Sequence, residues 1–165
     1  MKVNPPGTDD ASSTVTASTE SGTLAMLRWM LLCVLSLGLL GLGTELLLLK
    51  HVESPTQLIA PGLIAVALAI VVWHVMERGP ASVLALDCVM VLFVAAAALG
   101  MYYHYVANVE FQREVDPSLA GSALFWKAMA AKAPPALAPG AMAQLGLIGL
   151  AYTFRHPARR SHRGL

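Results

Sequence analysis

The stretch from Ser82 to Val106, SVLALDCVMVLFVAAAALGMYYHYV, contains one formally charged residue, Asp87, among mostly apolar side chains. It is longer than the ~20 apolar residues that cross the hydrocarbon core of a bilayer. Backbone amides in hydrocarbon must be hydrogen-bonded within their own segment, and the alternating polarity of a membrane strand is absent. The stretch is therefore predicted to be a transmembrane helix.

Three further apolar stretches approach or exceed this length: about Leu24 to Leu49, Leu58 to Met76 and Leu137 to Phe154. The composition agrees, because 56% of the 165 residues are hydrophobic and 13% are charged, whereas a soluble domain carries about 25% charged residues. We therefore predict an all-α integral membrane protein, built as a four-transmembrane-helix bundle. Its first span is interpreted as a retained anchor, because no basic segment of a cleavable signal peptide precedes it.

The flanking segments differ from the membrane domain in composition. Residues 1–23 are rich in Ser, Thr, Gly, Asp and Pro and are predicted to be a disordered tail, followed by a membrane domain over 24–155 and a basic tail over 156–165. The connection from about Ala107 to Ala136 is long. Its apolar residues Leu119, Leu124 and Trp126 favour a short interfacial helix on the outer leaflet, with an irregular loop as the alternative.

The basic residues predict the orientation in the membrane. One side carries seven of the eleven: Lys2, Arg28, Arg78, Arg155, Arg159, Arg160 and Arg163. The other carries four: Lys50, Arg113, Lys127 and Lys132. Both termini are therefore expected in the cytoplasm. The usage of Ala, Leu, Gly and Arg indicates a bacterial inner membrane.

Polar residues near the outer ends of the spans are the main candidates for a site, since ionisable groups inside a membrane are costly. They are Glu45, His51, Glu53, His104, Asn108, Glu110 and Gln144. Glu45 lies five residues before Lys50, which places it roughly 7 Å inside the outer boundary. Gln144 lies at a comparable depth from the same side.

Three interpretations of this outer group stay open. The first is hydrogen bonding between helices, with Glu45 protonated or paired with Gln144 or His104. The second is a metal or haem site in which His51 and His104 are ligands together with Glu45, Glu53 or Glu110, a set that suits Zn, Fe or Cu. The third is a proton-linked site in which Glu45 titrates next to His104.

A smaller polar group lies toward the inner ends of the spans. Asp87 is about seven residues into its span, and Arg28 and His74 lie near the same side. An Asp87–Arg28 or Asp87–His74 pair would compensate the buried charge. A structural role is favoured here over a route for protons.

The motifs that the sequence lacks, its net charge and its cysteines restrict the possible functions. It contains no phosphate-binding Walker loop, no nucleophile elbow and no CxxCH haem-attachment motif. A net charge of +1 does not indicate nucleic-acid binding, and Cys33 and Cys88 are interpreted as packing residues. We expect a non-enzymatic accessory or scaffold subunit of a membrane complex, or a homo-oligomer, in contact with lipid and without a cofactor. The alternative is a metal- or haem-binding or proton-coupled membrane protein.

Overall fold

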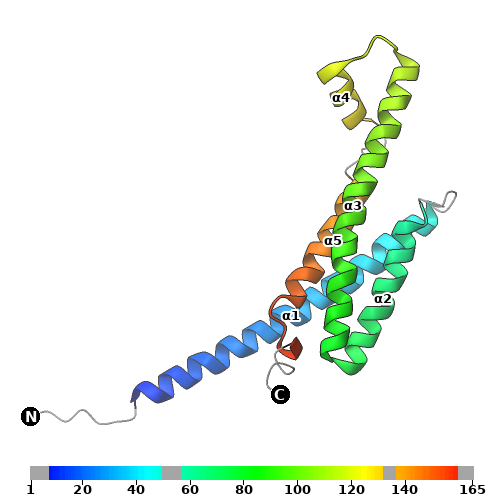
Figure 1. Cartoon of the computed structure of the whole chain (residues 1–165). Helices are drawn as coiled ribbons and strands as arrows, with labels where there is room; N and C mark the ends of the chain where they lie inside the picture. Colours follow the sequence, from blue (N-terminus) through cyan, green and yellow to red (C-terminus); the bar gives the residue numbers. More distant parts are fainter. Residues whose placement is uncertain (1–7, 50–56, 132–136, 160–165) are drawn as a thin grey trace, which may run out of the picture.

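The computed structural model describes residues 8–49, 57–131 and 137–159, and the side chains among them from residue 22 onward. These segments are mainly helical (Figure 1). The elements are α1 (Thr8–Leu48), α2 (Ile59–Glu77), α3 (Pro80–Val115), α4 (Gly121–Met129), α5 (Leu137–Thr153) and the 3-10 helix η1 (Pro157–Arg159). The predicted all-α fold is confirmed.

Three of these helices are long and apolar enough to cross a membrane: Gly22–Leu48 within α1, then α2 and α3. The fourth apolar helix, α5, has 17 residues, which corresponds to a length of about 26 Å at 1.5 Å per residue. A typical hydrocarbon core is ~30 Å thick. The arrangement is thus compatible with a four-helix membrane bundle.

The turn between α2 and α3 makes these helices antiparallel neighbours, as its short length predicts. Arg78 adopts a left-handed conformation with φ of 48°, and its amide donates to the His74 carbonyl oxygen at 2.8 Å. Gly79 is extended, and Pro80 opens α3 at a position where no intrahelical amide donor is needed. The two helices therefore pack side by side (Figure 1).

The core lies along one face of each long helix. On α1 the buried residues recur at helical spacing, and on α3 they form the centre of the bundle. The main members are Leu35, Leu39, Leu42 and Leu46 of α1, Ile64, Ala67 and Val71 of α2, Leu86, Met90, Phe93 and Ala97 of α3, and Met142 and Leu145 of α5. The opposite faces expose large apolar side chains, which is the pattern expected of surfaces that meet lipid.

Helices α3 and α5 approach each other most closely. A Cβ atom added to Gly146 would lie 2.9 Å from the Met90 carbonyl oxygen and 3.1 Å from the Phe93 Cβ atom, and one added to Gly149 would collide with the Met90 side chain. Small residues at such positions let two membrane helices pack backbone to backbone. The glycines of α5 therefore set its distance from α3.

Helix α1 crosses the other helices obliquely and packs on α2 and α5 (Figure 1). Its backbone is helical from Thr8, whereas residues 1–23 were predicted to be a disordered tail. Extending an existing helix needs one further hydrogen bond per residue fixed, so a polar segment can continue a helix that it would not nucleate. The early turns of α1 lead away from the bundle in Figure 1.

Helix α3 also extends beyond its predicted end at Val106. The added turns carry Glu, Gln and Arg, which form helices readily without being apolar. Asp116 ends the helix, and its carboxylate accepts hydrogen bonds from the backbone amide and hydroxyl of Ser118. The short helix expected in the following segment is present as α4.

Candidate functional site

His74 is one of three buried polar side chains at the inner end of the bundle, with 1% of its surface exposed. Its Nδ1 atom lies 2.8 Å from Ser82 Oγ on α3, and its Nε2 atom lies 2.6 Å from the Tyr152 hydroxyl on α5. One imidazole on α2 thus connects three helices.

The geometry around Ser82 fixes the direction of these hydrogen bonds. Ser82 Oγ also lies 2.9 Å from the Gly79 carbonyl oxygen, which can only accept. Ser82 therefore donates to Gly79 and accepts from the Nδ1–H group of His74. In a neutral imidazole the other nitrogen is then an acceptor, so Tyr152 donates to Nε2. The side chains of Ser82, His74 and Tyr152 are thus all paired in this series of hydrogen bonds.

A second set of polar contacts lies beside the first. The Thr153 hydroxyl of α5 donates to Asp87 Oδ1 of α3 at 2.6 Å, and Arg159 Nη2 forms an ion pair with Asp87 Oδ2 at 3.0 Å. The chain turns back after α5 at Arg155, where φ is 47°. This turn brings η1 against the start of α3.

Asp87 and Arg28 therefore have partners other than those that we predicted. Asp87 pairs with Thr153 and Arg159, while an Arg28 guanidinium nitrogen donates to the Arg155 carbonyl oxygen at 3.4 Å. The sequence placed Arg159 in the basic tail, because hydropathy shows where a span ends and does not show that the chain then folds back. The need of Asp87 for a partner was recognised, and the identity of that partner was not.

The His156 ring completes the group. Its centroid lies 5.5 Å from that of His74 and 5.3 Å from that of Tyr152. His156 follows the end of α5, and its pKa is lowered by burial first and by the nearby His74, Arg28 and Arg159 second. We call the set the inner polar network: His74, Ser82, Asp87, Tyr152, Thr153, His156 and Arg159.

Sequence reasoning found only Asp87 and His74 of this network. A signal for Ser82 exists, because it lies eight residues after His74 across a very short turn. Tyr152 and Thr153 are polar groups in the last turn of an apolar helix, and their partners come from distant segments.

The inner polar network is built to hold helices together. The serine–histidine pair has the residue types of an activated nucleophile, but Ser82 is 0% exposed and its hydroxyl donates to a carbonyl oxygen. A substrate has no access to it. Hydrogen bonds between membrane helices contribute about 0.6 kcal/mol on average, so several of them fix the register of α2, α3 and α5.

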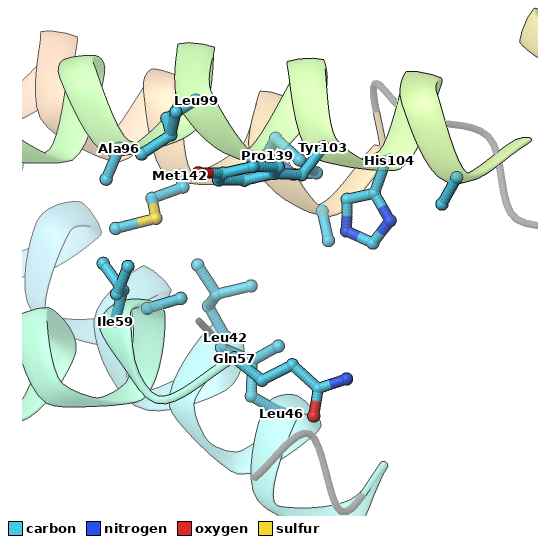
Figure 2. A pocket seen from close by; sticks show the side chains of 14 residues that line it. Leu42, Leu46, Gln57, Ile59, Ala96, Leu99, Tyr103, His104, Pro139 and Met142 are labelled. Atoms are coloured by element: carbon cyan, nitrogen blue, oxygen red, sulfur yellow. The ribbon is translucent and has the colours of Figure 1, made fainter. Parts of the chain in front are cut away.

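The outer candidates lie in several different surroundings. His104 of α3 lines a cavity of about 310 Å³ between the outer parts of the long helices, shown in Figure 2. We call it the outer cavity, and its walls come from α1, α2, α3 and α5. Its lining is Leu42, Leu46, Gln57, Ile59, Ala60, Ala96, Leu99, Gly100, Tyr103, His104, Ala107, Ala138, Pro139 and Met142.

Of the other predicted outer residues, Glu45, Asn108, Glu110 and Gln144 do not line this cavity. The side-chain amide of Asn108 donates to the Ala128 carbonyl oxygen at 3.1 Å and so joins α3 to α4. Glu110 and Gln144 are exposed on α3 and α5. His51 and Glu53 lie outside the described residues, so their predicted role as ligands stays a prediction.

Glu45 is exposed on α1, outside its buried face. It lies in a shallow groove along that helix, the α1 groove, lined by Leu37, Leu40, Gly41, Thr44, Glu45, Leu48 and Leu49. The Thr44 hydroxyl donates back to the Leu40 carbonyl oxygen at 2.8 Å. Within the described part of the chain, no side chain pairs with the Glu45 carboxylate.

The capacity of these residues to hold a metal is limited. Across residues 22–49, 57–131 and 137–159, no three His, Cys, Asp or Glu side chains gather as a set of metal ligands. Comparisons of the chain with protein-family models, with curated proteins and with solved structures find no match.

Proposed function

We propose that this chain is a non-enzymatic membrane protein that acts as an accessory or scaffold subunit of a larger membrane complex. The observation that carries the proposal is the position of Glu45. Ionisable residues of membrane helices almost always face the interior of a bundle or a water-filled cavity. Glu45 instead faces outward from its own bundle, in the α1 groove. A helix of a partner subunit lying in the groove would supply the missing polar contact.

The other residues of the α1 groove suit the packing of a second helix. A Cβ atom added to Gly41 would have no atom within 4 Å, so the backbone is accessible there. Gly41, Thr44 and Glu45 share one face at helical spacing, and small residues on such a face allow close approach. Leu37 and Leu48 flank them with 70% and 79% of their surfaces exposed.

The proposal includes the place of the protein in the cell. We infer a multi-pass protein of the inner (plasma) membrane with both termini in the cytoplasm. Four crossings return the chain to the side on which it started, and the basic residues near the inner network favour the cytoplasmic side. In Figure 1 the early turns of α1 and η1 lie toward the lower end of the molecule, and α4 lies at the upper end.

To test the proposal, the protein is extracted from native membranes in polymer-bounded discs. Native mass spectrometry then identifies the polypeptides that each disc contains. We expect the chain with a stoichiometric second polypeptide. Gly41→Leu fills the α1 groove and should release that polypeptide. The matched control is Gly62→Leu on α2, where an added Cβ atom also meets no atom within 4 Å, and it should leave the complex intact. Discs that hold a single copy, or copies of this chain only, would contradict an accessory role.

One observation favours the alternative function of a metal- or haem-binding protein. His104 lines the outer cavity together with Met142, and both side-chain types serve as axial haem ligands. The predicted partner ligand His51 lies outside the described residues. A visible absorption spectrum with metal analysis, on wild type and His104→Ala, tests this alternative. A Soret band or a near-stoichiometric transition metal that the substitution removes would support it, and a colourless, metal-free protein would contradict it. In that second case a proton-linked role of His104 in the outer cavity is the remaining form of the alternative.

A further inference from the structure

The outer cavity has the dimensions and lining of a small-molecule site. Its volume of about 310 Å³ lies at the lower end of the ~300–1,000 Å³ of such sites, which are mostly apolar with a few polar groups that fix orientation. Eleven of the fourteen lining residues are Leu, Ile, Ala, Gly, Pro or Met. The other three are Gln57, Tyr103 and His104.

Two of the three polar lining residues lie apart from much of the apolar lining of the outer cavity. In Figure 2 Gln57 and His104 lie toward one end, whereas Ile59, Ala96 and Met142 lie toward the other. His104 and Tyr103 come from the same turn of α3, and Gln57 comes from the residues just before α2. A ligand with an apolar part and a polar head would match both ends.

The charge of the lining restricts the head group. None of the described residues that line the cavity is Lys, Arg, Asp or Glu, so none of them would neutralise a fixed ionic head, and an unpaired charge in such a mostly apolar site is costly. Amide, phenol and imidazole groups both donate and accept hydrogen bonds. They suit a hydroxyl or carbonyl head.

We propose that the outer cavity binds an uncharged amphiphile, with a single alkyl chain between the apolar walls and a hydroxyl or carbonyl head at Gln57 and His104. The site is separate from the α1 groove. It does not depend on the accessory role, because no residue lines both. Failure of one proposal therefore leaves the other standing.

The test uses the full chain in discs of phosphatidylcholine and, as the probe, a monoacylglycerol with a photoactivatable diazirine in its acyl chain. After illumination, peptide mass spectrometry locates the labelled residues. We expect saturable labelling of the α3 and α5 segments around Ala96 and Met142. Excess unlabelled monoacylglycerol should compete, whereas a fatty-acid anion of equal chain length should not.

Two substitutions fill the cavity from opposite walls, Ala96→Phe on α3 and Ala60→Leu on α2. Each should lower saturable labelling about tenfold, since an added side chain in an occupied site forces the ligand out. Ala98→Phe is the matched control, because Ala98 is exposed two residues from Ala96 and lines no part of the cavity. Thermal unfolding of each variant shows that the bundle is retained, and two filling variants keep the test valid if one does not fold.

His104→Leu tests the head-group contact, and several-fold weaker competition by monoacylglycerol is expected. The proposal would be overturned by labelling that does not saturate, or that is spread over lipid-facing residues such as Val91 and Leu92 and is unchanged in both filling variants. Equal competition by the fatty-acid anion would overturn the assignment of an uncharged head.

Discussion

At the scale of single residues, the Tyr152 hydroxyl is the group whose removal tests the inner polar network most cleanly. Tyr152→Phe keeps the ring in its buried place and leaves His74 Nε2 without its donor. We expect the free energy of unfolding to fall by about 1–2 kcal/mol, the cost of a buried polar group left unpaired and near the upper end for membrane hydrogen bonds. Reversible unfolding in bicelles measures it.

The matched control for this substitution is Tyr102→Phe, at a tyrosine that is 61% exposed. It removes the same hydroxyl from the surface of α3, so its effect should be within about 0.5 kcal/mol of zero. Equal losses in the two variants would show that the inner hydrogen bond has no special role.

His156 makes the stability of the inner end depend on pH. Its pKa is lowered in the folded protein, first by burial and then by His74, Arg28 and Arg159. The unfolded chain therefore binds a proton at a higher pH than the folded chain does. Stability from this group is present above the unfolded pKa of about 6.5 and is lost as pH falls through the folded pKa.

The corresponding measurement compares wild type and His156→Gln from pH 7.5 to pH 5. The free energy of unfolding should fall more steeply with decreasing pH in wild type, since glutamine does not titrate. Both proteins keep Tyr152, whose ring contacts residue 156 in the wild type. Parallel pH profiles would contradict a role of His156.

The sequence predicts that certain polar side chains need hydrogen-bond or ion-pair partners. Asp87 and His74 were recognised because polar groups in apolar spans are costly. Their partners Arg159 and Tyr152 depend on how the chain turns after α5 and how the helices rotate about their axes. Neither property has a signal in hydropathy.

At the scale of elements, the contact of α3 with α5 depends on Gly146. Gly146→Ala would bring a methyl group within 2.9 Å of the Met90 carbonyl oxygen, a backbone atom that cannot move aside alone. We expect a loss of about 1–3 kcal/mol in unfolding free energy, the usual cost of overpacking. Gly140→Ala in the same helix is the control, since its added methyl meets no atom within 4 Å, and a comparable loss there would count against the packing argument.

Helix α4 is held on α3 by two kinds of contact. Leu124 and Ala128 are buried, and the Asn108 amide donates to the Ala128 carbonyl oxygen. Asn108→Ala should therefore raise the rate of amide hydrogen exchange across α4 while leaving α2 and α5 unchanged. Glu110→Ala, at an exposed site two residues on, should leave α4 as protected as in wild type. Unchanged exchange in Asn108→Ala would show that apolar contacts alone hold the helix.

Four apolar helices lie where the sequence predicted them, to within a few residues at most of their ends. They are about 20 apolar residues long, and hydropathy reports burial in lipid directly. The exceptions are the start of α1 and the end of α3, where the helix continues through polar residues. Hydropathy does not measure helical propensity, so it misses such extensions.

At the scale of the whole molecule, the arrangement of the spans decides which polar residues meet. The sequence suggested that Glu45 lies near His104 and Gln144, since all three share one side of the membrane. In the structure, where α1 crosses the other helices obliquely (Figure 1), these three residues lie in separate surroundings. Glu45 lies in the α1 groove, His104 lines the outer cavity and Gln144 is exposed. Depth along a span follows from counting residues, but the direction that a side chain faces requires the packed structure.

The proposed accessory role requires that the α1 groove face a partner subunit. It is tested by photocross-linking in native membranes with a benzophenone attached to a single introduced cysteine, in a background without Cys33 and Cys88. We predict that a cysteine at Leu37 or Leu48 forms a cross-link to a different polypeptide, whereas a cysteine at Val66, exposed on α2, forms none. If Leu37→Cys and Leu48→Cys form no more cross-link than Val66→Cys does, the α1 groove faces lipid and not a partner subunit.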